Sequence, residues 1–221
     1  MISFKLSIWI PLNLGIVFIS NINAALVGNF SFGGHYYEVY DDAVTWSAAR
    51  DSATAKTYQG SAGALVEINS ANENTAIFNF LQNNQGRFTS AAADGGNARY
   101  AWIGANDRNV EGTWVWDRSG TQFWNGNGNT GSAVGGNYNN WGGNGGLNEP
   151  DDFQGIQDAG AIALDNWGMP QIGSAGQWND IWESNTMPYI VEYPIPEPAH
   201  FSLAAAILGI GLLCRRHLTR K

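Results

Sequence analysis

Four carboxylates and a proline crowd into the stretch LNEPDDFQGIQD, which runs from Leu147 to Asp158. The other acids in it are Glu149, Asp151 and Asp152, and no lysine or arginine lies among them. Like charges this close repel one another, so the stretch is either a solvated acidic loop or a set of ligands whose repulsion a cation relieves. Calcium takes about six to eight oxygen ligands and accepts flexible geometry, so carboxylates and amides on loops suit it.

Further oxygen donors lie elsewhere in the chain. Asp107 and Glu111 stand four residues apart, and Asn179 and Asp180 lie in the segment QWNDIW. Paired carboxylates can also serve as acid and base in glycoside hydrolysis, across a cleft of about 5–9.5 Å. The acids here are adjacent along one loop, and the domain has no nucleophile–histidine pair. We therefore expect a binding protein and not an enzyme.

Two helices are predicted early in the chain. An aromatic strand at His35–Tyr40 is followed by a helical pattern, for which Asp41 and Asp42 are the expected N-cap acids. Ser70 lies three residues before Glu73, a capping box that predicts the start of the second helix.

Short strands follow these helices. Apolar or alternating patterns predict strands at Leu65–Ile68, Trp102–Gly104, Trp114–Trp116, 161–167, 177–182 and 188–194. The Gly- and Asn-rich stretch between Gly120 and Gly146 is expected to be a long loop, of a length that is usually functional. Its anchors in the core are expected to be Phe123, Trp124, Tyr138 and Trp141. Early helices followed by many short strands indicate an α+β domain.

Composition limits the function. The 221 residues carry a formal net charge of −8, which makes nucleic acid a poor partner and cations a good one. The length fits one globular domain with short appendages. The single cysteine, Cys214, lies in the C-terminal tail, so we expect a domain without disulfides.

The two ends of the chain have the composition of targeting segments. Residues 1–25 combine Lys5, an apolar run and small residues at positions 23–25, as a signal peptide does; the alternative is an N-terminal membrane anchor. At the other end, Pro196-Glu197-Pro198 precedes the apolar stretch AHFSLAAAILGIGLLC and a basic cluster. That stretch is slightly short for a transmembrane helix of about 20 residues, and its basic end should remain cytoplasmic.

This C-terminal arrangement, residues 195–221, resembles the PEP-CTERM sorting signal. The resemblance implies an exosortase-type sorting enzyme as a partner, at least a transient contact with the membrane, and a Gram-negative bacterium, often one that makes exopolysaccharide. The alternative is a plain membrane anchor. Either interpretation places the domain outside the cytoplasm, in the cell envelope, at the cell surface or in the extracellular matrix.

Residues 26–194 contain landmarks that, in this order, resemble the C-type lectin domain. The landmarks are His35-Tyr36-Tyr37, Trp46-Ser47-Ala48-Ala49, Gly63-Ala64-Leu65-Val66-Glu67-Ile68, Glu73-Asn74, Trp102-Ile103-Gly104, Glu111-Gly112-Thr113-Trp114, Glu149-Pro150-Asp151, Trp178-Asn179-Asp180 and Ile190-Val191-Glu192. The resemblance implies an α+β, C-type lectin-like fold with two helices, short antiparallel sheets and a long calcium-binding loop region.

The resemblance also implies two calcium ions. The implied ligands of the principal ion are Glu149, Asp151, Gln157, Asn179 and Asp180, and those of the auxiliary ion are Asp107, Glu111, Asp152 and Asp158. In sugar-binding members the proline of the principal motif is cis, which we expect of Pro150. Two neighbouring sugar hydroxyls join the principal ion there, so the implied sugar contacts are Glu149, Asp151, Asn179 and Asp180. An aromatic ring face could come from Trp141 or Trp167.

Two of these positions depart from the family pattern. Asp151 stands where mannose-binding members have Asn, which removes an amide donor, and Gln157 stands where Glu is usual. Together the two changes conserve the formal charge of the site. We therefore predict a calcium-dependent carbohydrate-binding protein for exopolysaccharide or cell-surface glycan. The alternative is a C-type-lectin-like scaffold that binds a protein or a surface and no sugar.

Overall fold

The computed structural model describes residues 25–144, 147–168 and 171–195. Nearly all of the predicted signal peptide and of the predicted C-terminal sorting segment, with its transmembrane helix and Cys214, lies outside these residues. Within the described ranges, no helix has the length and apolar character needed to cross a membrane.

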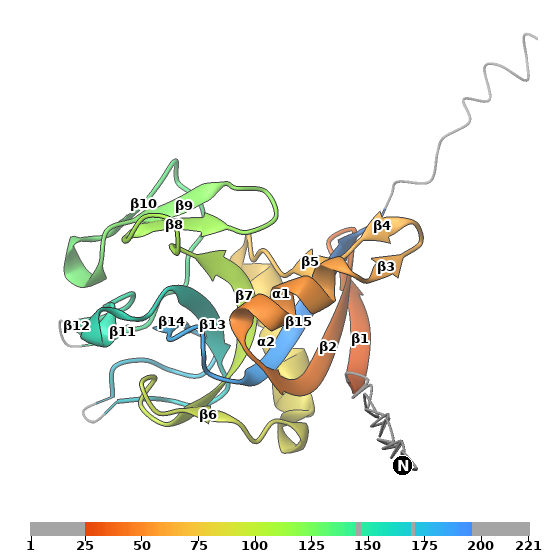
Figure 1. Cartoon of the computed structure of the whole chain (residues 1–221), viewed down its shortest axis with the longest axis horizontal. Helices are drawn as coiled ribbons and strands as arrows, with labels where there is room; N and C mark the ends of the chain where they lie inside the picture. The colour runs from red at the N-terminus through yellow and green to blue at the C-terminus, as the bar shows by residue number, and fades with distance from the viewer. Residues whose placement is uncertain (1–24, 145–146, 169–170, 196–221) are drawn as a thin grey trace, which may run out of the picture.

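A mostly antiparallel sheet forms the centre of the domain (Figure 1). Its main path, in spatial order, is β1 (Leu26–Phe32), β2 (His35–Val44), β15 (Met187–Pro194), β7 (Ala98–Asn106), β8 (Thr113–Trp116), β9 (Gln122–Asn125) and β10 (Ser132–Ala133). A branch leaves β7 through β13 (Ala159–Ala163) to β14 (Trp178–Ile181). The short strands are β3 (Thr57–Tyr58), β4 (Ser61–Ala62), β5 (Ala64–Leu65), β6 (Ala91–Ala92), β11 (Gly143–Asn144) and β12 (Leu147–Asn148).

Two α-helices accompany this sheet, α1 (Trp46–Thr54) and α2 (Ala71–Asn83), which confirms the predicted α+β class. Single 3₁₀ turns occupy Gln85–Arg87, Gly128–Thr130 and Phe153–Gly155. The described residues contain no cysteine and so no disulfide.

The predicted N-cap of α1 is wrong. Strand β2 runs through Asp41 and Asp42 because it stays paired with β15 as far as Val44. The cap is Thr45, whose hydroxyl accepts a hydrogen bond from the backbone N–H of Ala48. The predicted start of α2 is confirmed: Ser70 is the N-cap, and its hydroxyl accepts a hydrogen bond from the N–H of Glu73 at 3.2 Å.

Tryptophans hold the central strand in place. Trp102 on β7 donates to the carbonyl of Val44, and Trp46 on α1 donates to the carbonyl of Ile103, each at 2.9 Å. Gly104 follows on β7, where a Cβ atom would lie 3.0 Å from the carbonyl oxygen of Leu65. A side chain at this position would therefore push β5 away from the sheet.

The Gly- and Asn-rich stretch is only partly the predicted loop. It begins with β9, in which Trp124 pairs with Trp114 of β8, and β9 then pairs with β10. Phe123 is fully buried and Trp141 nearly so, as expected of anchors. The stretch therefore extends the sheet before it reaches the acidic segment.

Helix α2 and strand β14 are joined through one buried amide. The side chain of Asn74 donates to the carbonyl of Gly176 at 2.9 Å and accepts from the indole nitrogen of Trp178 at 2.7 Å. Trp178 directly precedes Asn179 and Asp180 on β14. The helix thus fixes the strand that carries two of the predicted ligands.

Candidate metal centre

The acidic segment turns sharply after β12. The peptide bond between Glu149 and Pro150 is cis, as predicted. Asp152 and Gln154 then adopt left-handed backbone conformations, with φ of 49° and 65°. These turns fold residues 149–158 back against β14.

Three carboxylates meet at the principal set. Single oxygens of Glu149, Asp151 and Asp180 lie within 4.8 Å of one another. Glu149 is 4% exposed and Asp180 is fully buried, whereas Asp151 is exposed. The set thus opens to solvent on the side of Asp151.

Asp180 organises the loop around it. Its two carboxylate oxygens accept from the backbone N–H groups of Asp151 at 3.2 Å and Asp152 at 2.8 Å. Glu149 accepts from the indole nitrogen of Trp167 at 2.9 Å, and the Asn179 amide donates to the hydroxyl of Tyr100 at 3.0 Å.

Two oxygens of this set remain without a hydrogen bond although they are buried. They are the second carboxylate oxygen, Oε2, of Glu149 and the amide oxygen, Oδ1, of Asn179. Buried polar atoms almost always have a partner, so an exception requires an explanation such as an ion. Both atoms are of the kind that calcium binds.

The electrostatics of the principal set agree with a cation-binding role. Burial raises the pKa of Glu149 to about 7; the bond from Trp167 opposes the rise and the charge of Asp151 adds to it. Burial, and next the charge of Glu149, also raise the pKa of Asp180. Neighbouring acids and burial both disfavour the charged forms, and a bound cation would restore them.

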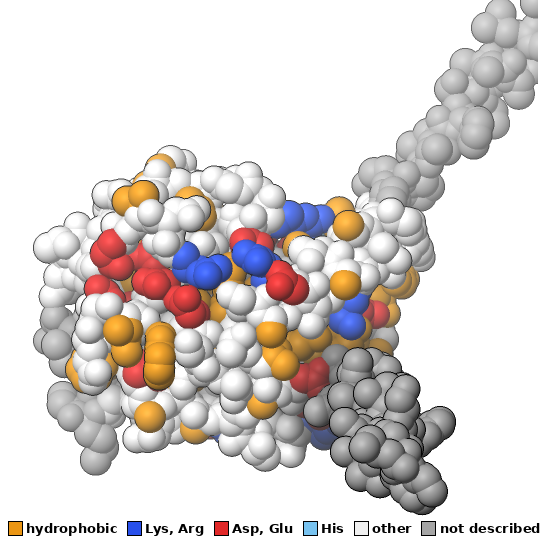
Figure 2. Space-filling view, viewed as in Figure 1, with side chains coloured by type: hydrophobic (Ala, Val, Ile, Leu, Met, Phe, Trp, Pro, Cys, Tyr) orange, Lys and Arg blue, Asp and Glu red, His pale blue; other side chains and the backbone are white. Residues whose placement is uncertain are grey.

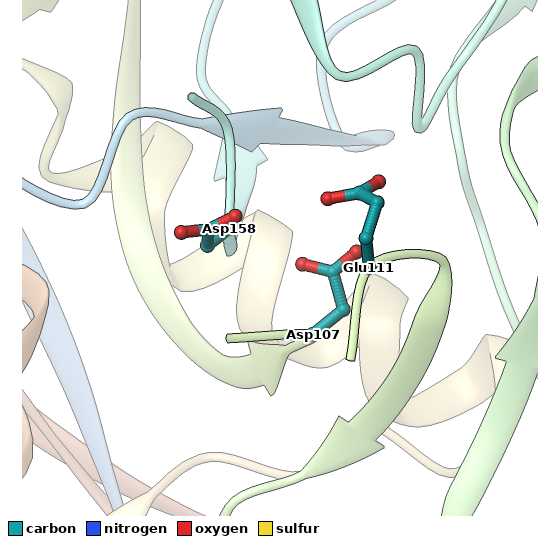
Figure 3. Close-up of side chains that lie close together, drawn as sticks. All are labelled: Asp107, Glu111 and Asp158. Atoms are coloured by element: carbon teal, nitrogen blue, oxygen red, sulfur yellow. The ribbon is translucent and has the colours of Figure 1, made fainter. Parts of the chain in front are cut away.

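A second set of carboxylates brings together Asp107, Glu111 and Asp158 (Figure 3). Single oxygens of the three lie within 4.8 Å of one another and point into a common space. Asp107 accepts from the N–H of Gly112 at 2.8 Å with one oxygen, and its other oxygen is buried without a partner. Burial raises the pKa of Asp107 to about 7, against the effect of the Gly112 bond.

Two predicted ligands have other contacts. Asp152 is not part of the three-carboxylate set, and its oxygen accepts from the backbone N–H of Gln157 at 3.2 Å. The amide oxygen of Gln157 accepts from the N–H of Phe153 at 2.8 Å, and its amide nitrogen donates to Asp94 at 3.1 Å. Gln157 is nonetheless buried beside Glu149 and Asp151, in the lining of one cavity of about 210 Å³.

Two acids at these sites were missed by sequence reasoning. Asp94 lines the same cavity and accepts from Gln157, from the N–H of Trp182 and from the amide of Asn185. Glu183 lies 3.6 Å from Arg108, and burial first, then contact with Asp158, raise its pKa. Both acids stand in segments without a motif, so only the fold identifies them.

The predicted aromatic faces are buried. Trp167 is 3% exposed and Trp141 is 8% exposed, so neither offers an open ring face. A Cβ atom at Gly173 would lie 2.1 Å from the Trp167 ring, so the backbone covers it closely. The exposed aromatics at this end are Phe153, which lines the cavity and is 48% exposed, and Trp182 at 46%.

One group of acidic side chains is visible on the face drawn in Figure 2. It lies in the region between β8 and β14, with basic side chains beside it. The residues present fit calcium at both sets, because every donor is an oxygen and each set contains a buried oxygen without a partner.

Comparison with known proteins identifies relatives of this domain. A family model described as the lectin C-type domain matches residues 44–190. Halomucin of Haloquadratum walsbyi is 31% identical over 172 residues, which is 75% of this chain. The chain spans only 2% of the length of halomucin.

Solved structures show the same fold. The C-type lectin CEL-I from Cucumaria echinata is 23% identical with a TM-score of 0.51, over 75% of this chain and 94% of that one. The mouse scavenger receptor C-type lectin carbohydrate-recognition domain is 23% identical with a TM-score of 0.50, over 77% of this chain and 96% of that one. Identities this low show a shared fold alone.

Proposed function

Because this chain belongs to the C-type lectin domain family, we propose that it is an exported protein that binds carbohydrate through calcium. The observation that carries the proposal is the pair of buried oxygens without partners, on Glu149 and Asn179, beside the buried carboxylate of Asp180. A calcium ion there would satisfy both oxygens and offset the repulsion among the acids.

The sugar would join the ion through two neighbouring hydroxyl groups. Glu149 and Asp180 are acceptors for those hydroxyls, and the Asn179 amide has one hydrogen left after its bond to Tyr100. The exposed ring of Phe153 supplies an apolar surface in the cavity of about 210 Å³ that Glu149 and Asp151 also line. This is binding without a chemical step, so the protein is proposed to be no enzyme.

Calorimetry and a glycan array test the proposal together. The full chain is titrated with calcium and then applied to an array of neutral and acidic glycans, with calcium and with chelator. We expect calcium binding and array signals that disappear with chelator. Signals that persist in chelator, or no calcium binding at all, would contradict the proposal.

A scaffold that binds a protein or a surface is the second candidate. The carboxylate of Asp151 favours it, because this side chain accepts from the N–H of Phe153 and has no amide hydrogen to donate to a sugar. Calcium binding together with an array empty of signals would support this candidate.

The proposed boundaries are a signal peptide at 1–25, the lectin domain at 26–194 and a PEP-CTERM sorting segment at 195–221. The Pro-Glu-Pro triplet, apolar stretch and basic end support the last of these. Expression in an exosortase-containing Gram-negative host, followed by mass spectrometry of the exported protein, tests it. Cleavage near residues 196–198 is expected, and an intact C-terminus in an exosortase-active host would contradict it.

A further inference from the structure

A second hollow is also lined by Glu149. It has a volume of about 230 Å³, and Glu149 is the residue that it shares with the cavity of the principal carboxylate set. Its other walls come from the Gly- and Asn-rich stretch, including Asn129 and Asn139, and from Asn148 of β12. It is smaller than the pockets of about 300–1,000 Å³ that take drug-sized ligands, a size that suits a single sugar ring.

The chemistry of this hollow is that of amides and indoles. Asn139 and Asn148 carry side chains that both donate and accept, which matches the hydroxyl groups of a sugar. Trp124 contributes aromatic surface, and Trp141, whose ring is buried, has an indole nitrogen without a hydrogen-bond partner. A polar ligand in the hollow could accept that hydrogen bond.

Glycines shape the wall around Trp124. A Cβ atom at Gly131 would lie 2.5 Å from the indole nitrogen of Trp124, so only glycine lets the backbone lie on this ring. The same indole donates to the carbonyl of Gly126 at 2.8 Å. The ring is therefore fixed from two sides.

A backbone hydrogen bond and a close glycine contact also fix the wall of the hollow next to Glu149. The N–H of Glu149 donates to the carbonyl of Gly142 at 2.8 Å. A Cβ atom at Gly143 would lie 2.4 Å from the side-chain oxygen of Asn148, whose amide donates to Asn129. The hollow is thus a formed part of the fold, tied to the carboxylate that the calcium would bind.

We propose that this hollow is a second saccharide subsite, which receives the sugar unit next to the one on the principal calcium. The inference rests on the proposed function and extends it: the recognised ligand is a segment of at least two linked sugars. Glu149 is the only charged residue that lines the hollow among the described residues, and it is acidic. The unit bound there is therefore a neutral sugar and not a uronic acid.

The test compares saccharide length in the full chain with calcium. Mannose, N-acetylglucosamine and the linear disaccharides and trisaccharides of each are titrated by calorimetry. We expect the preferred disaccharide to bind at least about tenfold more tightly than its monosaccharide, which is the gain from one or two added hydrogen bonds. The trisaccharide should add little beyond that.

Two variants assign the gain to the hollow. Asn139→Trp fills it, and should bring the disaccharide down to the affinity of the monosaccharide while calcium and monosaccharide binding stay unchanged. Asn139→Ala should lose part of the gain, which protects the test if the larger variant folds poorly. Asn137→Ala is the matched control, because Asn137 is exposed on the same stretch and does not line the hollow.

The outcomes separate the two proposals. Calcium-dependent monosaccharide binding without a gain for the disaccharide overturns the subsite alone, as does a gain that survives Asn139→Trp. Absence of binding by every saccharide overturns the subsite and the sugar-binding function together. Disaccharide binding that Asn139→Trp abolishes, with calcium binding retained, supports both.

Discussion

Among the described residues, five buried side-chain oxygens have no hydrogen-bond partner, and three of them, on Asp107, Glu149 and Asn179, belong to predicted calcium ligands. Leaving a buried polar atom unpaired costs about 1–3 kcal/mol, and more when the atom is charged. All three lie among other acceptor oxygens, which cannot donate the hydrogen bonds that these atoms lack. The metal-free protein should therefore be measurably less stable than the calcium form.

Replacing Asp107 by asparagine should separate calcium binding from stability. The side-chain oxygen of the variant keeps the bond from Gly112, and its new amide can donate to Glu111 or Asp158. We expect calcium stoichiometry to fall from two to one in calorimetry, and the metal-free protein to gain about 1–3 kcal/mol in denaturant unfolding.

Asp165→Asn is the control for this variant. Asp165 pairs with Arg99 at 2.7 Å, away from both carboxylate sets, so its loss should leave the calcium stoichiometry at two. If the Asp107→Asn protein still bound two calcium ions, Asp107 would not be a calcium ligand.

The metal-free protein should lose stability as pH rises. The folded pKa values of Glu149 and Asp107 are about 7, above their ordinary values of 4.5 and 3.8. Both groups therefore take up protons on folding between about pH 4 and 7, and the free energy of unfolding falls across that window. Thermal unfolding of chelator-stripped protein at pH 5 and 7.5 measures this; a higher midpoint at pH 7.5 would contradict it.

Residue types predicted part of this site. Acids clustered without counter-charges, such as Asp151 and Asp158, are visible in the sequence because they are neighbours along it. Asp94 and Glu183 were missed because their partners are brought near by folding: Asp94 meets Trp182 across 88 positions. No local pattern marks such a residue.

At the scale of elements, α2 and β14 act as a unit. Asn74 of α2 bonds to both Gly176 and Trp178, and it is buried. The position of Asn179 and Asp180 consequently depends on a helix that contributes no ligand of its own.

Asn74→Ala should weaken this connection. The indole of Trp178 and the carbonyl of Gly176 would each lose a buried partner, so we expect a loss of about 2–4 kcal/mol in denaturant unfolding. Calcium affinity at the principal set should fall with it, because β14 is less well held. Thr75→Ala is the matched control on the exposed side of α2 and should change neither quantity measurably.

The segment 149–158 should loosen when calcium is removed. Asp180 holds two of its backbone N–H groups, and repulsion from Glu149 opposes that arrangement when no cation is present. Hydrogen exchange followed by mass spectrometry should show faster exchange here in chelator, with α1 unchanged. Equal exchange in both conditions would show that the loop does not need the ion.

Local patterns predicted the elements whose signals are local. The Ser70 and Glu73 pair marked the start of α2 because capping involves residues close in sequence. The C-terminal end of β2 was missed because the strand extends to Val44 through pairing with Met187, which lies far along the chain. Strand β9 was missed for the same reason: a partner strand, and not its Gly- and Asn-rich composition, decides it.

At the scale of the molecule, calcium is expected to provide the support that disulfides give many exported domains. Ligand that binds only the folded state stabilises it by about 2.7 kcal/mol per site at 100 times the dissociation constant. The unfolding midpoint should therefore rise with calcium concentration, and magnesium should act much more weakly because it demands stricter geometry. Reductant should not change the midpoint, since residues 25–144, 147–168 and 171–195 contain no cysteine; insensitivity to calcium would contradict the expectation.

The last strand, β15, ends beside the first residue of β2. His35 pairs with Pro194, and the N–H of Ile195 donates to the carbonyl of Gly34, while β11, β12 and β14 lie at the opposite end in Figure 1. A domain held by its C-terminal end would therefore present the acidic segment outward, at the far side from its point of attachment. Many copies fixed to one surface in this way would present parallel binding sites. Weak binding of each site to a long polymer would then add up through avidity.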